Sequence, residues 1–458
     1  MKVLKFGGTS VGTVASLLNV KDIVERLSEP AVIVVSALGG LTDGLINSAR
    51  SAANGDDVYI TDLQEYNKRH HDIIDGVVNE DKKDALHIEI DDFFNELKRL
   101  YDGVFFIKDL PEKTLDSIVS FGERMSSRIV AAMIKNATHR DSTKIVKTEK
   151  WFGKNIADTR LTDSLIKEHI NPDAGKPVVM GGFISTDRDT GEITNLGRGG
   201  SDFTAALVAA SLDADELQIW TDVDGFMTSD PRIIPDARII DAMSFVESME
   251  LCSFGAKVIY PPTIYPVFHK NIPIKILNTF NPKAPGTLIT DLSGSRKHTE
   301  EKVRGISALK NTCLVSIKGN LTRNLASISS RTYNILARKG ISVFLVSPPE
   351  EDDLFSFALK IEDIDSALSL LNEEFAPEAT NGDLEDISHI TSLAIIALVG
   401  DEILKAGPIT PRVYNTLMRN DIELFASSEG ASRTTVTFVV KEEEVNKALG
   451  LVHALFFN

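Results

Sequence analysis

The stretch Lys5-Phe6-Gly7-Gly8-Thr9-Ser10-Val11-Gly12 directly follows the apolar pair Val3-Leu4. The apolar pair predicts a strand, and the glycines predict a turn at its carboxyl end, where backbone N–H groups can approach an oxyanion closely. Thr9 and Ser10 are predicted to cap a following helix, and Lys5 adds a positive charge. The stretch is not a Walker A loop, because Thr13 follows Gly12. It predicts a strand–turn–helix unit that binds an anion such as phosphate, with a purely structural glycine turn as the alternative.

Length and composition indicate a globular protein of more than one domain. The chain has 458 residues, of which 43% are hydrophobic and 25% are charged, so two or three domains are expected. The formal net charge of −17 argues against nucleic acid or an anionic membrane as a partner. We recognise no secretory signal and no apolar run of membrane-spanning length in the sequence.

Cysteine and histidine usage predicts neither a disulfide framework nor a metal site. The two cysteines, Cys252 and Cys313, fit a reducing compartment, and we expect a cytoplasmic protein. The pair His70-His71 lies in a polar helical stretch, and we find no matching pattern of Cys, His or carboxylates for it. A solvated helix face is therefore expected there, and no metal-binding residue is predicted.

Residues 1–293 alternate short apolar runs with longer helical patterns. Apolar runs without alternation are typical of strands that are buried on both faces. This part of the chain therefore predicts an α/β domain whose central sheet is mostly parallel and is covered by helices on both faces. The predicted strands are 1–6, 31–36, 144–147, 177–181, 216–221 and 274–276. The predicted helices are 14–27, 62–78, 84–100, 114–132 and 202–212, the last with Ser201 as its cap.

A polar break separates this domain from a repeated pattern. Residues 281–302 are rich in Pro, Gly, Ser and charged residues, which predicts a linker over 294–305. Residues 306–385 and 386–458 then repeat one β-α-β-β-α pattern, which is typical of ferredoxin-like domains. Neither repeat shows a catalytic constellation. The expected strands are 312–318, 341–347, 355–361, 393–399, 422–427 and 434–440, and the expected helices are 325–338, 364–375, 411–419 and 445–456.

Three further segments place polar residues at or beyond the ends of predicted strands, where α/β proteins bind ligands. Residues 36–43 offer backbone amides and the hydroxyl of Thr42 to an anion. Residues 197–202, Gly-Arg-Gly-Gly-Ser-Asp, place Arg198 among three glycines, where its guanidinium can bind a carboxylate through two hydrogen bonds. Residues 220–222 end a strand at which the polar parts of a nucleotide could be held. A purely structural loop remains the alternative for each segment.

Two more motifs add a carboxylate and a second lysine. Residues 120–126 place Glu123 near the start of a long amphipathic helix, where a carboxylate is also a common partner of the helix dipole. Residues 254–257 end on the isolated Lys257. Lysines, an arginine, glycine turns and carboxylates together suit a phosphate donor beside a small zwitterion. The sequence therefore predicts phosphoryl transfer, which needs mainly positioning and neutralisation of charge.

Taken together, these motifs resemble those of the aspartate kinases, within the amino-acid kinase superfamily, over nearly the whole chain. The two C-terminal repeats resemble the two ACT regulatory domains of that family. The resemblance implies an amino-acid kinase fold followed by two ferredoxin-like ACT units. It rests on six segments that occur in the family's order, namely 5–12, 121–124, 197–202, 220–222, 229–232 and 254–257.

The resemblance also implies a reaction, in which ATP with Mg²⁺ and L-aspartate give ADP and 4-phospho-L-aspartate. This is the first step toward lysine, threonine and methionine. The attacking carboxylate is ionised at neutral pH, so no general base is required. By the family's pattern the catalytic residues are Lys5, Gly7, Gly8 and Asp202, aspartate is bound by Thr42, Glu123, Arg198 and Ser201, and the nucleotide is bound by Thr221, Asp222, Met227, Arg232 and Lys257.

Departures from the family pattern leave several points open. Met227 stands where the family often has tyrosine. Phe344 and Pro348-Pro349 stand where lysine-sensitive relatives carry an aspartate and a Ser-Glu pair, so effector contacts cannot be transferred. We expect feedback by lysine first, or threonine, at an interface between ACT units of a homodimer or higher homo-oligomer. The chain ends soon after the second repeat, so we expect the monofunctional type without a homoserine dehydrogenase domain.

Two rival interpretations remain. One is an amino-acid kinase that acts on glutamate or a related acid. The other is a non-catalytic amino-acid sensor in which a kinase-like domain serves as a scaffold. The tandem repeats argue against the first, and the intact Lys5, Arg198, Asp202 and Lys257 argue against the second.

Overall fold

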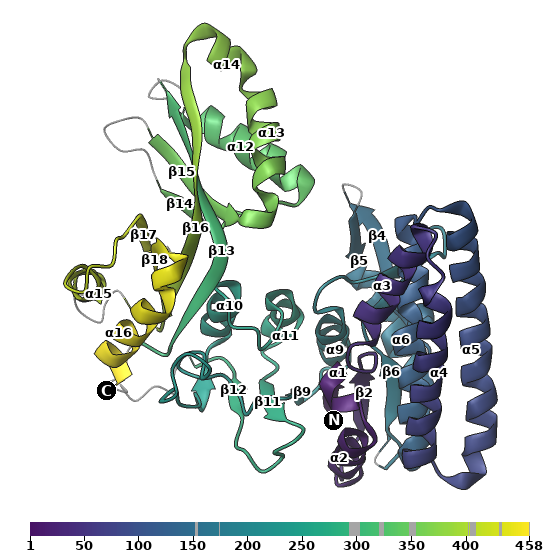
Figure 1. The fold of residues 1–458 in the computed structure, drawn as a ribbon. Helices are drawn as coiled ribbons and strands as arrows, with labels where there is room; N and C mark the ends of the chain where they lie inside the picture. The colour runs from purple at the N-terminus through teal and green to yellow at the C-terminus, as the bar shows by residue number, and fades with distance from the viewer. Residues whose placement is uncertain are drawn as a thin grey trace. The chain divides into compact units, whose positions relative to one another are not determined.

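A computed structural model of the chain describes residues 1–151, 154–173, 175–292, 303–319, 325–347, 354–401, 403, 409–429 and 433–457. These residues form two compact units (Figure 1). The first unit comprises residues 1–226, 241–245 and 258–292, and the second comprises 227–240, 246–257 and 293–458. The predicted domain limits at 293, 305 and 385 remain predictions, and residues 294–302 of the predicted linker lie outside the described residues.

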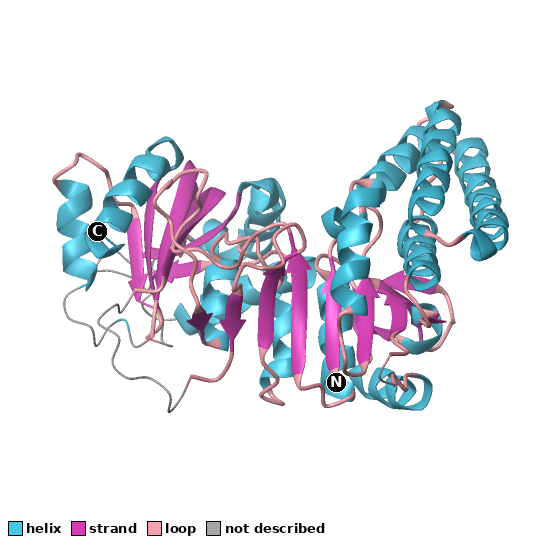
Figure 2. Cartoon of the chain, turned by 90° about the horizontal axis from the view of Figure 1, so that it is seen from below, coloured by secondary structure: helices cyan, strands magenta, loops and turns pink. Residues whose placement is uncertain are grey.

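The first unit is built on a mostly parallel eight-stranded sheet with the order β10-β12-β11-β9-β1-β2-β6-β3 (Figure 2). Only the β11–β12 pair is antiparallel. The predicted parallel sheet is therefore confirmed. Its strands are β1 (Lys2–Phe6), β2 (Ala31–Val35), β3 (Thr138–Arg140), β6 (Val178–Gly181), β9 (Glu216–Thr221), β10 (Ala242–Met243), β11 (Ile274–Asn278) and β12 (Thr287–Ile289).

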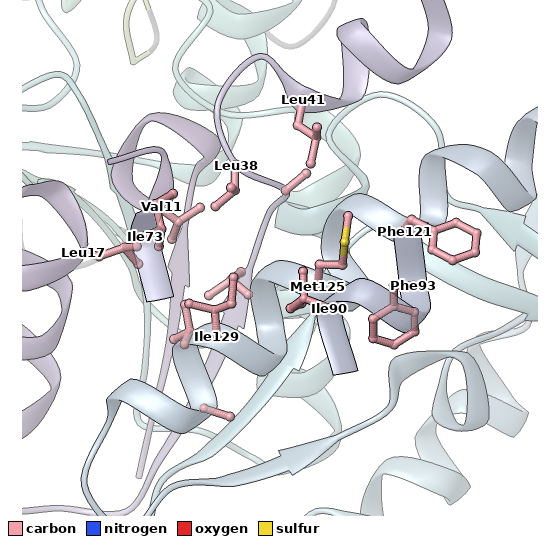
Figure 3. Close-up of a cluster of buried hydrophobic side chains, with 14 of the residues drawn as sticks. Val11, Leu17, Leu38, Leu41, Ile73, Ile90, Phe93, Phe121, Met125 and Ile129 are labelled. Carbon is pink, nitrogen blue, oxygen red and sulfur yellow. The ribbon is translucent and has the colours of Figure 1, made fainter. Parts of the chain in front are cut away.

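Alternation along β1 sends its side chains to two different faces of the sheet. Leu4 and Phe6 are fully buried in a large core that includes residues of α2 to α6, and Figure 3 shows Val11, Leu38 and Phe121 in this core. Val3 and Lys5 point to the opposite face, on which α9 packs. The helices of this unit are α1 (Gly8–Val11), α2 (Val14–Glu25), α3 (Leu41–Ala53), α4 (Val58–Val77), α5 (Glu80–Ile107), α6 (Glu112–Met133), α7 (Ser142–Ile145), α8 (Thr159–His169), α9 (Gly200–Ser211) and α11 (Ile264–Phe268).

A second, four-stranded sheet in the first unit has the order β5-β4-β7-β8. It consists of β4 (Lys147–Trp151), β5 (Lys154–Ala157), β7 (Ile184–Asp187) and β8 (Ile193–Asn195). The sequence did not separate these strands from the main sheet. The strand β8 leads directly into the loop before α9, which is the segment 197–202 singled out above.

The predicted strand at 144–147 is wrong. Residues 142–145 form the helical turn α7, because the carboxylate of Asp141 accepts a hydrogen bond from the amide of Thr143 at 3.1 Å and so favours a helix start. The strand β4 begins only at Lys147.

Two of the predicted helix caps are also wrong. Thr9 and Ser10 lie inside α1, and α2 is capped instead by Thr13, which exchanges hydrogen bonds of 3.1 Å with Ser16. Ser201 lies in the first turn of α9, whose N-terminal residue is preceded by Gly199 at φ 68°. Glycine takes that position because a left-handed backbone strains other residues.

The second unit contains a six-stranded antiparallel sheet with the order β14-β15-β13-β16-β18-β17. Its strands are β13 (Gly305–Gly319), β14 (Leu345–Ser347), β15 (Leu354–Lys360), β16 (Leu384–Val399), β17 (Ala426–Glu429) and β18 (Thr435–Lys441). Its helices are α10 (Phe245–Ser253, which starts at the unit boundary), α12 (Leu325–Lys339), α13 (Ile364–Glu374), α14 (Ala376–Asn381), α15 (Ile409–Met418) and α16 (Val445–Phe457). The two predicted β-α-β-β-α units are both present.

The two repeats exchange halves of their longest strands. Residues 305–309 of β13 pair with 395–399 of β16, beside β18, whereas 312–319 pair with 384–393, beside β15. The register shifts between the halves, where Asn311 and Ser392 take φ of 57° and 59°. Each repeat thereby gains a fourth strand from the other. The predicted limit at 385/386 falls inside β16.

The strands that were expected at 341–347 and 422–427 are shorter in the structure. Residues 341–344 and 422–425 form no strand, and β14 and β17 begin at Leu345 and Ala426. Phe344 packs, partly buried, against the cluster on the sheet that includes Leu314 and Leu393. In the described part of the chain, no helix combines the length and apolar character needed to cross a bilayer.

Two helix glycines of the first unit provide a matched test of its packing. A Cβ at Gly122 of α6 would lie 2.6 Å from the Cβ of Ala37, whereas a Cβ at Gly103 of α5 would meet nothing within 4 Å. Alanine favours a helix over glycine by about 1 kcal/mol. Gly103→Ala should therefore stabilise the unit by about 0.5–1 kcal/mol, whereas Gly122→Ala should destabilise it by about 1–3 kcal/mol because neither Cβ can move without its backbone.

Urea unfolding followed by tryptophan fluorescence measures this difference, because Trp151 and Trp220, the two tryptophans of the chain, both belong to the first unit. Equal shifts of the midpoint in the two variants would show that α6 has room to move away from Ala37.

Candidate active site

The predicted site residues of the first unit gather at one edge of its main sheet. The parallel strands β1, β2, β6, β9 and β11 end at the same edge, and each is followed by a polar or glycine-containing turn. Such an edge is where ligands bind in parallel α/β sheets. The order of the strands brings together segments that are far apart in the sequence.

Lys5 forms an ion pair with Asp202 at the centre of this edge. Lys5 is the penultimate residue of β1, a central strand, and it faces α9. The Nζ atom of Lys5 lies 2.6 Å from Oδ1 of Asp202, and both side chains are only 12% exposed. Two of the predicted site residues are therefore in contact, and a shielded positive charge lies beside the first glycine turn.

The first glycine turn packs tightly against the turn that follows β2. The amide of Gly7 donates a hydrogen bond to the carbonyl of Trp220 in β9 at 3.2 Å. A Cβ on Gly8 would lie 3.1 Å from the carbonyl oxygen of Ala37 and 3.3 Å from the Cα of Gly39. A side chain at position 8 would therefore push the two turns apart, which is a physical reason for the glycine there.

Glu123 is buried at the same edge with half of its carboxylate unpaired. Its Oε1 atom accepts a hydrogen bond from the amide of Ala37 at 3.0 Å, and its Oε2 atom has no hydrogen-bond partner in the described part of the chain. Burial raises the pKa of Glu123 to about 8, although the Ala37 amide and, more weakly, Lys5 oppose that shift. A cation that reached Oε2 would stabilise the ionised form, so Glu123 is suited to bind an ammonium group.

Ser201 and Glu123 both flank the turn after β6. A Cβ on Gly181 would lie 3.1 Å from the Cβ of Glu123, and a Cβ on Gly182 would lie 2.5 Å from that of Ser201. The glycines let this turn approach α6 and α9 at once. Two of the predicted aspartate-binding residues are therefore brought together by the backbone.

Arg198 lies on the loop that precedes α9, between two glycines in the left-handed region, Gly197 at φ 70° and Gly199 at φ 68°. Its side chain is exposed and forms no hydrogen bond or ion pair with the described residues. A free guanidinium on a loop of defined backbone geometry can bind an incoming carboxylate. Thr42, half-buried, lies in the first turn of α3 after the β2 turn.

The end of β9 carries the predicted nucleotide residues of the first unit. Thr221 ends the strand, and its hydroxyl donates to Oδ1 of Asp222 at 3.1 Å. The side-chain amides of Asn278 and Asn281 both donate to Oδ1 of Asp224, at 2.8 and 3.2 Å. Asn278 ends β11 and Asn281 follows it, and neither was predicted from the sequence as a site residue.

Three predicted nucleotide residues, Met227, Arg232 and Lys257, belong to the second unit. Met227 is half-buried, Lys257 is exposed, and Arg232 makes two hydrogen bonds of 2.9 and 2.7 Å to the carboxylate of Asp230. Their contribution to a nucleotide site stays a prediction.

The partners of His71 were not predicted from the sequence. His71 contacts His87 through the two Nδ1 atoms, and its Nε2 lies 2.8 Å from Asp91, while the Nε2 of His87 lies 3.1 Å from Asp75. The His–x₃–Asp spacing on α4 and again on α5 is the signal that could have revealed this cluster. His70 points inward instead, and burial lowers its pKa to about 4. Within the described ranges, no group of three or more His, Cys, Asp or Glu residues is arranged to hold a metal ion.

Comparisons with known proteins identify the family of the chain. The sequence profile of the Amino acid kinase family matches residues 1–278, and an ACT domain profile matches 396–456. The chain is 32% identical, over its whole length, to a bifunctional aspartokinase/homoserine dehydrogenase of Buchnera aphidicola, of which it covers 57%. It is 30% identical to aspartokinase 1, chloroplastic, of Arabidopsis thaliana over 99% of this chain and 80% of that protein. The chain thus spans little more than half the length of the bifunctional relative.

Solved structures of one bacterial enzyme resemble the chain throughout. Aspartokinase III of E. coli in complex with aspartate and ADP superimposes with a TM-score of 0.85 at 26% identity, covering 100% of both chains. The same enzyme in complex with lysine and aspartate gives a TM-score of 0.75 with the same coverage. A profile match over more than half of the chain and the identity to a plant aspartokinase along most of its length agree on one assignment: this chain belongs to the amino acid kinase family and, within it, to the aspartokinases.

Proposed function

We propose that the protein is an aspartate kinase, which transfers the γ-phosphoryl group of ATP to the side-chain carboxylate of L-aspartate. The single observation that supports this best is the shielded Lys5–Asp202 pair beside two glycine turns and the half-paired carboxylate of Glu123. A cation for phosphate and an anion for an ammonium group are what an amino-acid kinase needs. The relatives named above are aspartokinases, and one was solved with aspartate and ADP.

In the proposed reaction the chain supplies positioning and charge. An oxygen of the aspartate side chain attacks the γ-phosphorus, the bond to the β–γ bridging oxygen breaks, and ADP leaves. Lys5 neutralises the charge on the transferring group, and the amide of Gly8 approaches its oxygens. The amide of Gly7, which the family's pattern also assigns to the phosphoryl group, is bonded to the carbonyl of Trp220 in this structure. Asp202 holds the Lys5 ammonium at 2.6 Å and so fixes where that charge lies. The nucleophile is already ionised at neutral pH and needs no base.

Aspartate would be oriented by residues of the helices α3, α6 and α9 and of the loop that precedes α9. Glu123 would receive the ammonium group on its unpaired Oε2 atom, and Arg198 would bind a carboxylate. Thr42 and Ser201 would add hydroxyl hydrogen bonds.

The nucleotide would lie along the end of β9, with Thr221 and Asp222 as its contacts. The resemblance also assigns Met227, Arg232 and Lys257 to the nucleotide. Mg²⁺, which keeps several waters and binds phosphate oxygens, needs at most one or two carboxylates of the chain. The carboxylates of Asp202 and Asp222 at this edge fit that need, and when bound the ion would neutralise phosphate charge.

The first test is an ADP-release assay with L-aspartate and with L-glutamate. We expect ADP release with L-aspartate and not with L-glutamate. We expect Lys5→Ala to lower kcat by about 10²–10³-fold, which is the scale of removing one charge-stabilising donor. Lys2→Ala is the matched control, because Lys2 lies at the other end of β1 and pairs with Glu29 at 2.8 Å.

Turnover with glutamate would establish the rival kinase, and no turnover with either acid would favour the sensor interpretation. A Lys5→Ala enzyme that kept more than about a tenth of the normal rate would contradict the role of Lys5. Such a variant would have raised the activation barrier by less than about 1.4 kcal/mol.

A second prediction concerns the pH dependence of aspartate binding. With a pKa of about 8, Glu123 is protonated at pH 6–7 in the free protein, and binding an ammonium group requires its ionised form. The KM for aspartate should therefore fall by up to about tenfold per pH unit between pH 6 and 7.5 and level off above pH 8.

Glu123→Gln should raise KM and remove this slope. Asp116→Asn is the matched control, because Asp116 is a buried carboxyl two turns earlier on α6 whose pKa burial raises to about 6. A slope that persisted in Glu123→Gln would assign it to another group.

We further propose that lysine, or next threonine, inhibits the enzyme by binding to the ACT units of a homodimer or higher homo-oligomer. One structure of the E. coli relative contains lysine. Phe344 packs against the sheet and is apolar. Other groups would therefore have to bind the side-chain ammonium of lysine. Titrating activity with each amino acid tests this: half-maximal inhibition by lysine at a lower concentration than by threonine is expected. Inhibition by threonine alone would reverse the order, and no response to either would remove the proposal.

A further inference from the structure

The glycine turn that would receive the phosphoryl group cannot fix its own position. It includes α1, which is a single helical turn of four residues, and so short a helix is not stable by itself. Its position must come from anchors on other elements. Three are present, namely the bond from Gly7 to Trp220, a bond of 2.8 Å from the guanidinium of Arg69 to the carbonyl of Gly12, and a side-chain bond between Ser10 and Thr279.

The Ser10–Thr279 bond is the one made in the middle of the turn. The two hydroxyl oxygens lie 2.7 Å apart, and both residues are 0% exposed although they are separated by 269 positions in the chain. A hydrogen bond fixes distance and direction more narrowly than an apolar contact of the same size. Loss of one hydroxyl would also leave the other buried and unpaired.

The segment that contains Thr279 also contacts the predicted nucleotide residues. The amide of Thr279 donates to the carbonyl of Thr221 at 2.9 Å. The side chain of Asn278 contacts the carbonyl of Asp222 at 3.5 Å, and together with Asn281 it holds Asp224 as described above. The four-residue segment 278–281, which begins with the last residue of β11, thus touches both the glycine turn that would receive the phosphoryl group and the end of β9.

We propose that residues 278–281 position the reacting groups, and that Thr279 is the positioning residue that sets the glycine turn relative to the end of β9. This inference rests on the proposed function. Thr279 acts through Ser10 and Thr221 and does not touch the substrates. A shift of the turn by a fraction of an ångström would move the amide of Gly8 away from the transferring group, so the effect should appear in kcat more than in the KM for aspartate.

The test compares Thr279→Val, Thr279→Ser, Ser10→Ala and the double variant Ser10→Ala/Thr279→Val. Thr162→Val is the matched control, because Thr162 is also 0% exposed and its hydroxyl bonds to the backbone of Lys147 at 3.0 Å. The measurements are kcat, the KM values for ATP and aspartate, the dissociation constant for MgADP from calorimetry, and the thermal unfolding midpoint.

We expect Thr279→Val to lower kcat by about tenfold or more while the KM for aspartate changes less than about twofold. Thr279→Ser, which keeps the hydroxyl, should restore kcat to within about threefold. The double variant should lose no more than Thr279→Val alone, because one shared bond is removed. Thr162→Val should lower the unfolding midpoint to a similar extent without changing kcat more than about twofold.

If Thr279 had a purely structural role, Thr279→Val would lower the unfolding midpoint but leave kcat within about twofold of the normal value. That result would contradict the proposal. Failure of Thr279→Ser to restore kcat would also overturn it, since size and not the hydroxyl would then matter. If the unsubstituted protein had no aspartate kinase activity, the proposed function would be contradicted. Failure of the proposed function can therefore be distinguished from failure of the proposal for Thr279.

Discussion

The contact between Lys5 and Asp202 is the constraint on which the arrangement of the site depends. A lysine that is so little exposed needs an anion beside it. Burial removes water from its ammonium group, and only a nearby negative charge compensates for that loss. The partner can come only from the face of the sheet to which Lys5 points, and that face is covered by α9. The start of α9 is therefore held at the end of β1, and the loop with Arg198 is held there with it.

Close approach of backbones is the second feature that shapes the site. Gly8 meets the turn after β2, Gly122 meets Ala37, and Gly182 meets Ser201, each at a distance where a Cβ does not fit without movement. The site is therefore built from turns and helices whose backbones approach one another closely. Main-chain amides hold their positions better than long side chains do, which is an advantage for a reaction that depends on the placement of charge.

The sequence predicted the positions of the chemistry better than the contacts that organise it. The buried strands and the order of the motifs were readable, because apolar runs and glycine turns are local signals. The partners of Glu123 and Ser10 were not readable, because one is a backbone amide and the other lies 269 residues away. The wrong caps have a local cause, since Gly199 in the left-handed region, not the hydroxyl of Ser201, begins α9. The His71–His87 contact was missed because it depends on how α4 lies against α5.

The exchange of strand halves between β13 and β16 has a consequence for how the second unit can be divided. Residues 305–309 complete the sheet of the second repeat, and 384–390 complete that of the first. A cut anywhere between the end of β13 and the start of β16 would separate these two strands and leave both pieces with an unpaired edge. Folding of one repeat also requires residues that lie beyond the other in the chain. The tandem repeats are therefore best regarded as one cooperative folding unit, inherited and engineered together.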